Sequence, residues 1–364
     1  PIPLSEIHHI EIVRGSAAAS YGADAVGGII HVKTKTYEGL WEKEQSQTNG
    51  NLAFGQHNLT LADVGFHQQG KHFGFSAGMK TNSSNGEQHV NPNHVYDSNS
   101  FHHKFHNKGD SLYSNHFDLK TYTAAIAYRK NNLKIYARAG VDRREFAAKY
   151  FYTPSILDES IEKVNSYWTQ AAAIYQGTKS RTDLNISYRN NTDSFAWNPA
   201  YTANEHTSDR VNATLSQNRS LKGYNLSYGF QSDYQKIVST SIGDHEMSSN
   251  AAFILAHKRF NDLSVNGGLR VENSEKIGTQ LVPQVNIAYT KNNKYILRSS
   301  IGRSIRQADF TERYYLSNSK SIPAERNIGN PDLAAESAYT FDIGVDAYLN
   351  KNLQISNTVF ARQS

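Results

Sequence analysis

From residue 48 onward the chain alternates apolar and polar residues with a period of two. The segments 183–189 and 341–349 show the pattern clearly. A third example is the apolar set Leu133, Ile135, Ala137, Ala139 and Val141, which alternates with the polar or amphipathic set Lys134, Tyr136, Arg138 and Asp142. Successive side chains of a β-strand point to opposite faces of the sheet, so each segment predicts a strand with one apolar and one polar face. A single such strand fits a soluble β-sandwich as well as a membrane β-barrel.

Composition narrows the class of protein. The 364 residues have a mean hydropathy of −0.63 and contain no apolar run close to the ~20 residues that a spanning helix needs, which excludes a helical membrane protein. Barrel strands need only ~9–11 alternating residues, so the same composition is compatible with a β-barrel. The chain has no cysteine, which removes disulfides and cysteine-based metal sites. Its net charge of +5 is spread along the chain, and we expect no nucleic-acid partner.

The predicted connections alternate between short and long. Short polar turns are expected near residues 131–132, 178–180, 219–222, 261–262, 291–293 and 350–351, and long polar connections at 81–115, 147–163, 192–208, 238–248 and 303–335. Short periplasmic turns alternate with longer extracellular loops in outer-membrane barrels. The sequence therefore predicts an all-β transmembrane antiparallel barrel, with about fifteen strands present between residue 48 and the end.

Four tyrosines, Tyr128, Tyr188, Tyr289 and Tyr348, are expected near strand ends at the short turns. Aromatic side chains form girdles at the two membrane interfaces of such barrels. We therefore interpret these four as structural residues of the girdle on the short-turn side.

The first 36 residues have a different character. Two β-branched runs, 10–13 and 29–32, flank a segment rich in small residues, which predicts a strand, a turn and a strand. The segment resembles the end of the plug domain of TonB-dependent outer-membrane receptors, with its run E-V-x-R-G-P-x-S-x-x-Y-G-x-x-A-x-G-G-x-I-N-I-x-T-K. The matching residues are Arg14, Gly15, Tyr21, Gly22, Ala25, Gly27 and Gly28.

A second resemblance to the same receptors lies near the other end of the chain. Residues 298–314 and 329–344 are similar to the receptors' barrel signature G-x-x-x-R-x-P-x-x-x-E-x-Y … G-N-P-x-L-x-P-E-x-x-x-x-x-E-x-G. The sequence departs from it at Gln307, Ala308, Ala335 and Asp342. The two resemblances imply that residues 1–36 are the C-terminal part of a plug domain. Residues 37–364 would then be part of a 22-stranded barrel, with most of the plug and the last strands outside this chain.

The resemblance implies active import rather than covalent chemistry. A receptor of this family binds a scarce, bulky nutrient such as cobalamin, a ferric siderophore or haem outside the cell. It then imports the nutrient through the outer membrane of a Gram-negative bacterium with energy from the TonB complex, in some cases with a surface lipoprotein as a further partner. Residues 144–154 and 241–245 resemble the cobalamin-receptor branch. The alternatives are a passive porin, or a surface nutrient-binding β-protein without energised transport.

No catalytic site is expected. The sequence contains no glycine-rich phosphate loop, no nucleophile elbow and no zinc-type histidine spacing. We therefore predict that the protein is not an enzyme and has no cofactor, and we assign no metal site.

One predicted contact joins plug and barrel. The family match places the plug arginine at Arg14 and a barrel acid at Asp342. A desolvated charge without a partner costs several kcal/mol, so an arginine inside a barrel needs an acid. We predict that Arg14 and Asp342 form a latch between plug and wall; the alternative is that Asp342 is a hydrated lumen carboxylate and that Arg14 pairs elsewhere.

Candidate ligand-binding residues lie in the long connections. Segment 87–116 is rich in histidine and contains His102, His103 and His106. Imidazole binds metal ions and haem iron, although the spacing here matches no defined site and polar loops often carry histidine without function. Aromatic residues of other long connections, Tyr150, Tyr152, Trp197 and Tyr201, are candidates for stacking on a ligand.

Overall fold

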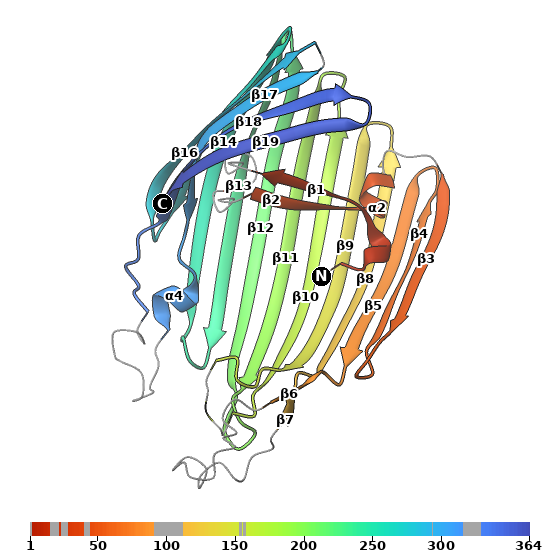
Figure 1. The fold of residues 1–364 in the computed structure, drawn as a ribbon, viewed down its shortest axis with the longest axis vertical. Coiled ribbons are helices and arrows are strands. Elements are labelled where there is room, and N and C mark those ends of the chain that lie inside the picture. Colours follow the sequence, from red (N-terminus) through yellow and green to blue (C-terminus); the bar gives the residue numbers. More distant parts are fainter. Residues whose placement is uncertain are drawn as a thin grey trace.

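The computed structural model describes residues 2–14, 22, 28–39, 44–90, 112–152, 155, 158–292, 294–315 and 329–364. One 15-stranded antiparallel sheet dominates the molecule, with the strand order β19-β18-β17-β16-β15-β14-β13-β12-β11-β10-β9-β8-β5-β4-β3 (Figure 1). The elements are η1 Leu4–Glu6, β1 Ile7–Arg14, β2 Gly28–Thr34, α2 Lys35–Glu38, β3 Gln45–Phe54, β4 Thr60–Gln69, β5 Phe73–Ser84, β6 Gln88–Val90, β7 Leu112–Ser114, β8 Phe117–Lys130, β9 Leu133–Ala147, β10 Ile161–Gln176, β11 Ser180–Ala196, β12 Asn204–Leu221, β13 Tyr224–Ser239, β14 His245–Phe260, β15 Leu263–Ser274, β16 Gly278–Lys291, β17 Tyr295–Arg306, α4 Phe310–Tyr314, β18 Glu336–Asn350 and β19 Leu353–Gln363.

The sheet is curved and open. Within the described residues β3 and β19 are its two edges, and neither pairs with the other. The predicted incomplete barrel with about fifteen strands is therefore confirmed. Among the described residues no helix is long and apolar enough to cross a membrane.

The two faces of the sheet have opposite character. Ile135, Ile186 and Ile343 on the convex face are 43%, 45% and 40% exposed, whereas Arg138 and Asp142 on the concave face are 5% and 1% exposed. This is the reverse of a soluble protein, in which apolar side chains fill the interior. An apolar outer surface is stable when lipid covers it, so the period-two pattern in the sequence placed the two faces correctly.

Short turns and long connections lie at opposite edges of the sheet, along the upper and the lower edge in Figure 1. Asn131, Asn261 and Asn292 occupy the short turns with φ between 50° and 52°. Asparagine tolerates this left-handed conformation, which matches the twist of two-residue hairpins. The alternation of connections is as predicted, but the strands reach further than expected. Of the predicted loop 192–208, only 197–203 lies outside β11 and β12.

Outward-facing aromatic residues form two belts. At the short-turn edge Phe73 lies against Tyr128, with ring centroids 5.0 Å apart, and Tyr289 and Tyr348 lie near the turns of their own strands. The prediction for Tyr188 is wrong. It pairs with Val211 in the middle of β11 and lies beside Tyr167, 6.1 Å between ring centroids. These two side chains belong to the opposite belt.

The spacing of the belts matches a membrane. Tyr224 and Tyr234 both lie on β13, the first at its short-turn end and the second further along the strand. They are about ten residues apart, or roughly 33 Å along the strand. With a strand tilt of about 40°, this corresponds to the ~25 Å apolar band of outer-membrane barrels.

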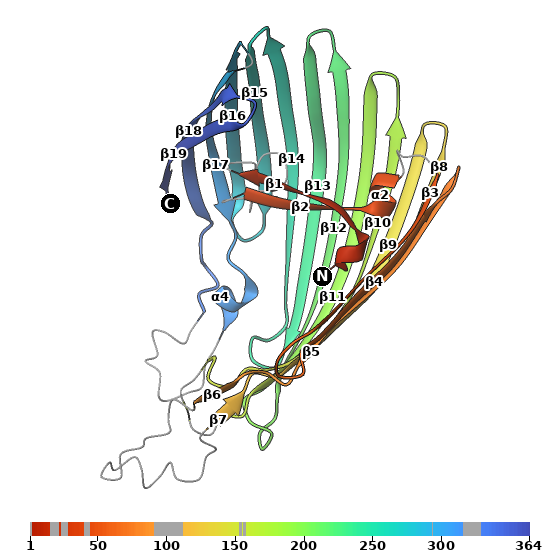
Figure 2. The same ribbon diagram turned by 45° about the vertical axis from the view of Figure 1, so that its right-hand side comes forward.

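The N-terminal residues form a separate two-stranded sheet. β1 pairs with β2 from Ile7↔Thr34 to Arg14↔Gly28, which confirms the predicted strands at 10–13 and 29–32. The hairpin lies on the concave side of the large sheet and crosses its strands (Figures 1 and 2). Its base, formed by η1 and α2, lies against β4, β5 and β8. The hairpin thus occupies the side of the sheet that becomes the lumen of a closed barrel.

Candidate functional site

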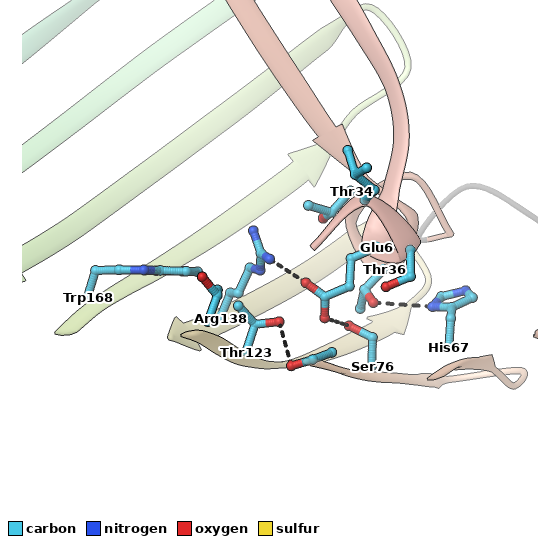
Figure 3. Close-up of polar contacts among 12 residues, drawn as sticks. Glu6, Thr34, Thr36, His67, Ser76, Thr123, Arg138 and Trp168 are labelled. Carbon is cyan, nitrogen blue, oxygen red and sulfur yellow. Dashed lines mark hydrogen bonds and ion pairs between the residues drawn. The ribbon is translucent and has the colours of Figure 1, made fainter. Parts of the chain in front are cut away.

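A buried ion pair joins the base of the hairpin to the sheet. The carboxylate of Glu6 accepts from the Arg138 guanidinium of β9, and the two side chains are 2% and 3% exposed (Figure 3). The Ser76 hydroxyl of β5 donates to the same carboxylate at 3.5 Å. Each charge has lost its water, so each depends on the other: removal of one partner leaves an uncompensated buried charge.

Asp63 of β4 binds the backbone of η1. Its carboxylate oxygens accept from the N–H groups of Leu4 at 2.7 Å and Ser5 at 2.9 Å. The first N–H groups of a helical turn have no partner within the turn, so a carboxylate at this end satisfies them. Asp63 is fully buried. Its two charge-assisted hydrogen bonds fix the position of η1 on the wall.

A dent in the sheet receives η1. Gly65 of β4 and Gly78 of β5 are direct partners in the ladder, so both lack a side chain at one point of the concave face. A Cβ atom at Gly65 would lie 2.4 Å from Ser5 Oγ, and one at Gly78 would lie 2.9 Å from Glu6 Cδ. Real Cβ atoms do not approach other atoms so closely. Glycine in a strand interior marks a place where another segment comes near, and here that segment is η1.

The α2 side of the hairpin base makes a second contact with the wall. The Thr34 hydroxyl lies 3.2 Å from Tyr136 OH, and the Thr36 hydroxyl lies 3.2 Å from His67 Nδ1. Tyr37 OH accepts from Arg181 at 3.4 Å, and its ring packs edge-on against Tyr136, 5.6 Å between centroids. Burial raises the pKa of Tyr37, because a phenolate would lose its hydration there.

A network on the wall holds Arg138 in place. The guanidinium lies 4.9 Å from the ring centroid of Trp168 on β10, a distance that allows a cation–π contact. The indole N–H donates to Asp142 Oδ2 at 3.2 Å, and Thr121 donates to Asp142 Oδ1 at 2.8 Å. Gly140 lets the indole lie flat on the sheet, because a Cβ there would be 2.3 Å from Trp168 Cζ2. Arg138 is therefore oriented from the wall side as well as by Glu6.

Aromatic residues surround a cavity at the long-connection edge. The cavity measures about 560 Å³. Tyr150 and Tyr152 both line it, and Tyr113, His116, Lys149 and Glu162 contribute polar groups. Tyr150 packs edge-on against Tyr113, 5.0 Å between centroids. The structure thus brings two of the four predicted aromatic residues to one cavity.

Trp197 and Tyr201 are placed apart from that cavity. Their rings lie 5.4 Å apart in the 197–203 connection. The Trp197 carbonyl accepts from the Glu159 N–H at 3.1 Å, which joins this connection to the preceding one. The four aromatic residues therefore form two groups on neighbouring connections of the same edge.

The second sequence motif folds into a compact cap around α4. Asp309 and Glu312 form a reciprocal capping box at the start of the helix. Arg313 is 1% exposed and donates to the carbonyls of Ala308, Pro331 and Leu333, which fastens the two ends of the connection together. Ala308 is one of the positions at which the sequence departs from the family pattern. The contact with Arg313 does not depend on its side chain, because Arg313 binds the backbone carbonyl.

Several predicted residues lie outside the described part of the chain. These are Gly15, Tyr21, Ala25, Gly27, His102, His103 and His106. Gly22 has a φ of 129°, in the region that favours glycine, and Gly28 is the ladder partner of Arg14. The contact between Arg14 and Asp342 stays a prediction. Asp342 faces the concave side of β18, where its carboxylate accepts from the Ser300 hydroxyl.

The strongest contacts between hairpin and wall were not predicted. Glu6, Asp63, Arg138, Gly65 and Gly78 were not selected as site residues. The sequence holds a signal for the wall residues: each lies on the polar, inward face of its strand, where a buried charge needs a partner and a glycine lets another segment come close. Among the described residues, no group of three or more His, Cys, Asp or Glu side chains is arranged to hold a metal ion.

Comparison with known proteins agrees with this geometry. A family model described as TonB dependent receptor-like, beta-barrel, matches residues 53–363. The vitamin B12 transporters BtuB of Photobacterium profundum and Vibrio vulnificus are 22% and 21% identical to the chain, over 94% and 96% of its length. The alignments cover 52% and 53% of those proteins, so the chain spans about half the length of the curated relatives it matches.

A local match and two solved structures extend the comparison. An iron-regulated outer membrane virulence protein of Vibrio cholerae is 40% identical over 50 residues, 14% of this chain and 7% of that protein. A variant of the ferric enterobactin receptor PfeA from Pseudomonas aeruginosa superposes with a TM-score of 0.78, and the siderophore receptor PirA from Acinetobacter baumannii with 0.77. Both are 15% identical to this chain, and the superpositions cover 99% of this chain and 58% of each receptor. These two comparisons show a similar fold.

The family match covers most of the sheet, and the sheet carries the apolar outer face and the two aromatic belts of a membrane barrel. The chain therefore belongs to the family of TonB-dependent receptor-like β-barrels, proteins of the outer membrane of Gram-negative bacteria.

Proposed function

We propose that this chain is part of a receptor that binds a scarce, bulky nutrient at the cell surface and imports it with energy from the TonB complex. The observation that carries the proposal is the hairpin, which is anchored inside the curved sheet through Glu6 and Arg138. Residues 1–36 are then the end of the plug and residues 37–364 part of the barrel wall. A passive channel would have no need of a folded segment fastened across its lumen.

The anchoring contacts suit a plug that must be displaced. They are mainly polar: Asp63 and Arg138 bind the hairpin through charges, and Ser76 through a hydroxyl. When the hairpin leaves, water can hydrate these wall residues, whereas an apolar contact surface would stay exposed at a cost proportional to its area. Buried ion pairs also contribute little net stability compared with an apolar replacement. The wall therefore tolerates loss of the plug.

For the nutrient, we propose cobalamin first and a ferric siderophore or haem as alternatives. Cobalamin is favoured because the two BtuB relatives described above, which align over nearly the whole chain, are named vitamin B12 transporters. The iron-containing nutrients are supported by the local match to an iron-regulated protein and by the siderophore receptors of similar fold. Tyr150 and Tyr152 are proposed to contact one part of the ligand, since a cavity of about 560 Å³ is the size of a drug-like group.

Trp197 and Tyr201 form the second proposed contact, and His102, His103 and His106 are candidate ligands if the nutrient contains iron. A surface lipoprotein remains an expected partner by family resemblance. The protein is proposed to have no enzymatic activity and no cofactor of its own.

Binding titrations of the full-length receptor in detergent test the ligand. Cobalamin, haem and a panel of ferric siderophores are compared in parallel. Tight cobalamin binding that falls at least tenfold in Tyr152→Ala, but less in Tyr152→Phe, would support the assignment and the aromatic contact. If haem or a ferric complex binds and cobalamin does not, the triple substitution of His102, His103 and His106 by Ala becomes the next test. Binding of none of these would refute the nutrient assignment.

Transport is tested separately from binding. Uptake of the bound nutrient is compared in cells with and without a functional TonB complex. We expect uptake to disappear without TonB while surface binding remains. Uptake that continues without TonB, and that rises linearly with nutrient concentration, would favour the passive channel instead.

A further inference from the structure

The ladder between β16 and β17 stops before either strand does. The last pair is Gln284↔Gly302, although β16 begins at Gly278 and β17 continues to Arg306. Both strands keep their other neighbours along these residues: β16 pairs with β15 from Gly278 onward, and β17 pairs with β18 through Arg306. Residues 278–283 and 303–306 thus face each other across a gap in the hydrogen-bond ladder, named here the seam.

Side chains fill the seam in place of backbone hydrogen bonds. The Arg303 guanidinium donates to the Leu281 carbonyl at 2.7 Å and to Gln280 Oε1 at 2.9 Å. Val282 and Ile305 are 0% and 1% exposed and pack together. Ile305 has the strand parity of the outward-facing Ile301, so its burial shows that it turns into the seam. The strands separate at the seam, but side chains fill the space between them.

A proline lies at the end of the ladder. Pro283 is the first residue of β16 beyond the last pair, and it still lies opposite Leu269 of β15. Proline has no N–H to donate to a neighbouring strand. Because Pro283 has no N–H that could be left without an acceptor, the free-energy cost of leaving this part of β16 unpaired is lower.

The chain that follows β17 crosses inward and docks on β14 and β13, the third and fourth strands along the sheet. Phe310 packs with Ile237 of β13 and Met247 of β14 in one buried cluster. The Tyr314 ring stacks on His245 with 3.5 Å between centroids. In the strand order, β16 and β15 lie between β17 and this docking site.

The end of β17 is tied directly to the docked helix. Arg306, the last residue of β17, donates to both carboxylate oxygens of Glu312 in α4 at 2.8 Å. The side-chain amide of Gln307, the next residue, contacts Met247 of β14. The position of the end of β17 is therefore set together with that of α4, and Arg306 is among the residues of β17 that have no ladder partner on β16.

We propose that α4 docking and the seam form one two-state switch at the extracellular mouth of the barrel. In the observed state α4 is docked and the seam is unpaired. When α4 leaves β13 and β14, the end of β17 relaxes against β16 and the ladder continues in its existing register, with Leu281 opposite Ile305. The apolar contacts of α4 are then exchanged for backbone hydrogen bonds. The role of the switch in uptake rests on the proposed function; the switch itself does not.

Hydrogen exchange of the full-length receptor in detergent tests the coupling. The double variant Phe310→Ala/Tyr314→Ala removes the docking contacts, and Tyr315→Ala, an exposed neighbour, is the matched control. We expect the fastest-exchanging amides of 279–282 and 303–306 to slow at least tenfold in the double variant and to stay unchanged in the control. Unchanged exchange in a double variant that still shows the heat-dependent gel mobility of a folded barrel would overturn the proposal.

A second measurement needs no change to α4. The chain has no cysteine, so engineered pairs are unambiguous. Leu281→Cys/Ile305→Cys bridges the seam, and Val285→Cys/Ile301→Cys bridges the ladder below it as the control. We expect the control pair to oxidise at least ten times faster. Equal rates would mean that the seam is already paired, and would also overturn the proposal, whatever the result of the uptake experiments.

Discussion

Glu6 and Arg138 lie 132 residues apart in the sequence and form a buried ion pair between the hairpin and the wall. Arg138 also lies over Trp168, so the wall contacts the guanidinium on a second side. Glu6 has no comparable second anchor, since its other contact is the 3.5 Å hydrogen bond from Ser76. The wall thus holds the guanidinium through two contacts, whereas Glu6 depends mainly on Arg138.

Replacing Arg138 should release the hairpin. Arg138→Met leaves the Glu6 carboxylate buried without its partner, which costs about 3–5 kcal/mol in comparable pairs. We expect the amides of β1 and β2 to lose protection from hydrogen exchange by about two to four orders of magnitude. The double variant Glu6→Gln/Arg138→Met should recover most of that protection, because it buries no unpaired charge. Strictly additive effects of the two single changes would contradict this account.

The glycine dent should tolerate no side chain. Gly78→Ala and Gly65→Ala place a methyl group against Glu6 and Ser5, and overpacking of this kind costs about 1–3 kcal/mol. The expected readout is faster exchange in η1 and β1, with the barrel intact on unheated gels. Gly267→Ala is the control, since no atom lies within 4 Å of a Cβ there. If all three variants behave alike, the dent is not a docking site.

The α4 cap should loosen in acid. Arg306 donates to both carboxylate oxygens of Glu312 at 2.8 Å, and these hydrogen bonds, with that from the Asp309 N–H, hold the pKa of Glu312 below its usual value. The folded-state pKa is lower than the unfolded one, so the stabilisation is complete above about pH 4.3 and is lost as the pH falls through the folded value.

Hydrogen exchange of residues 309–315, corrected for its intrinsic pH dependence, measures this effect. Protection should be constant from pH 7 to about pH 4.3, the unfolded pKa of a glutamate, and should fall below that. Glu312→Gln should show lower protection at pH 7 and little change with pH. A Gln variant with the pH profile of the parent would assign the transition to another group, of which Glu336 is the first candidate because its carboxylate also accepts from Arg306.

The predicted latch between Arg14 and Asp342 has its own test. Asp342→Lys should weaken retention of the hairpin, because it would place two cations together. Exchanging the charges in Arg14→Glu/Asp342→Lys should restore it. Retention is measured by protease cleavage of the plug in the assembled receptor, with Asp342→Asn as the uncharged control. If charge reversal leaves retention and uptake unchanged, Asp342 is a lumen carboxylate bound to Ser300 and no more.

The sequence was sufficient for the membrane part of the wall. Lipid requires an apolar residue at every second position, and this constraint made residues such as Ile135 and Ile343 readable as outward-facing. The constraint ends where the strands leave the membrane. Residues 192–194 and 204–208 continue β11 and β12 but are polar at every position, so the sequence pattern indicates a loop there.

The contacts of the hairpin were less predictable for a different reason. Arg138 is recognisable as an inward-facing charge, but its partner is set by where the hairpin lies on the wall, and no local pattern records that. Gly65 and Gly78 are adjacent only through the β4–β5 register. The family pattern points to Arg14 instead. A sequence pattern shows which residues recur, but it does not show which contacts they make.

The order of contacts along the first residues has a mechanical consequence. Leu4 and Ser5 bind Asp63, and Glu6 binds Arg138, in the same order as they occur in the chain. A force applied to the chain on the N-terminal side of Leu4 would break these contacts one after another, from Leu4 toward Glu6. The peak force then corresponds to a single contact, whereas bonds loaded side by side would have to break together. A firmly held segment can in this way be removed by a weak pull.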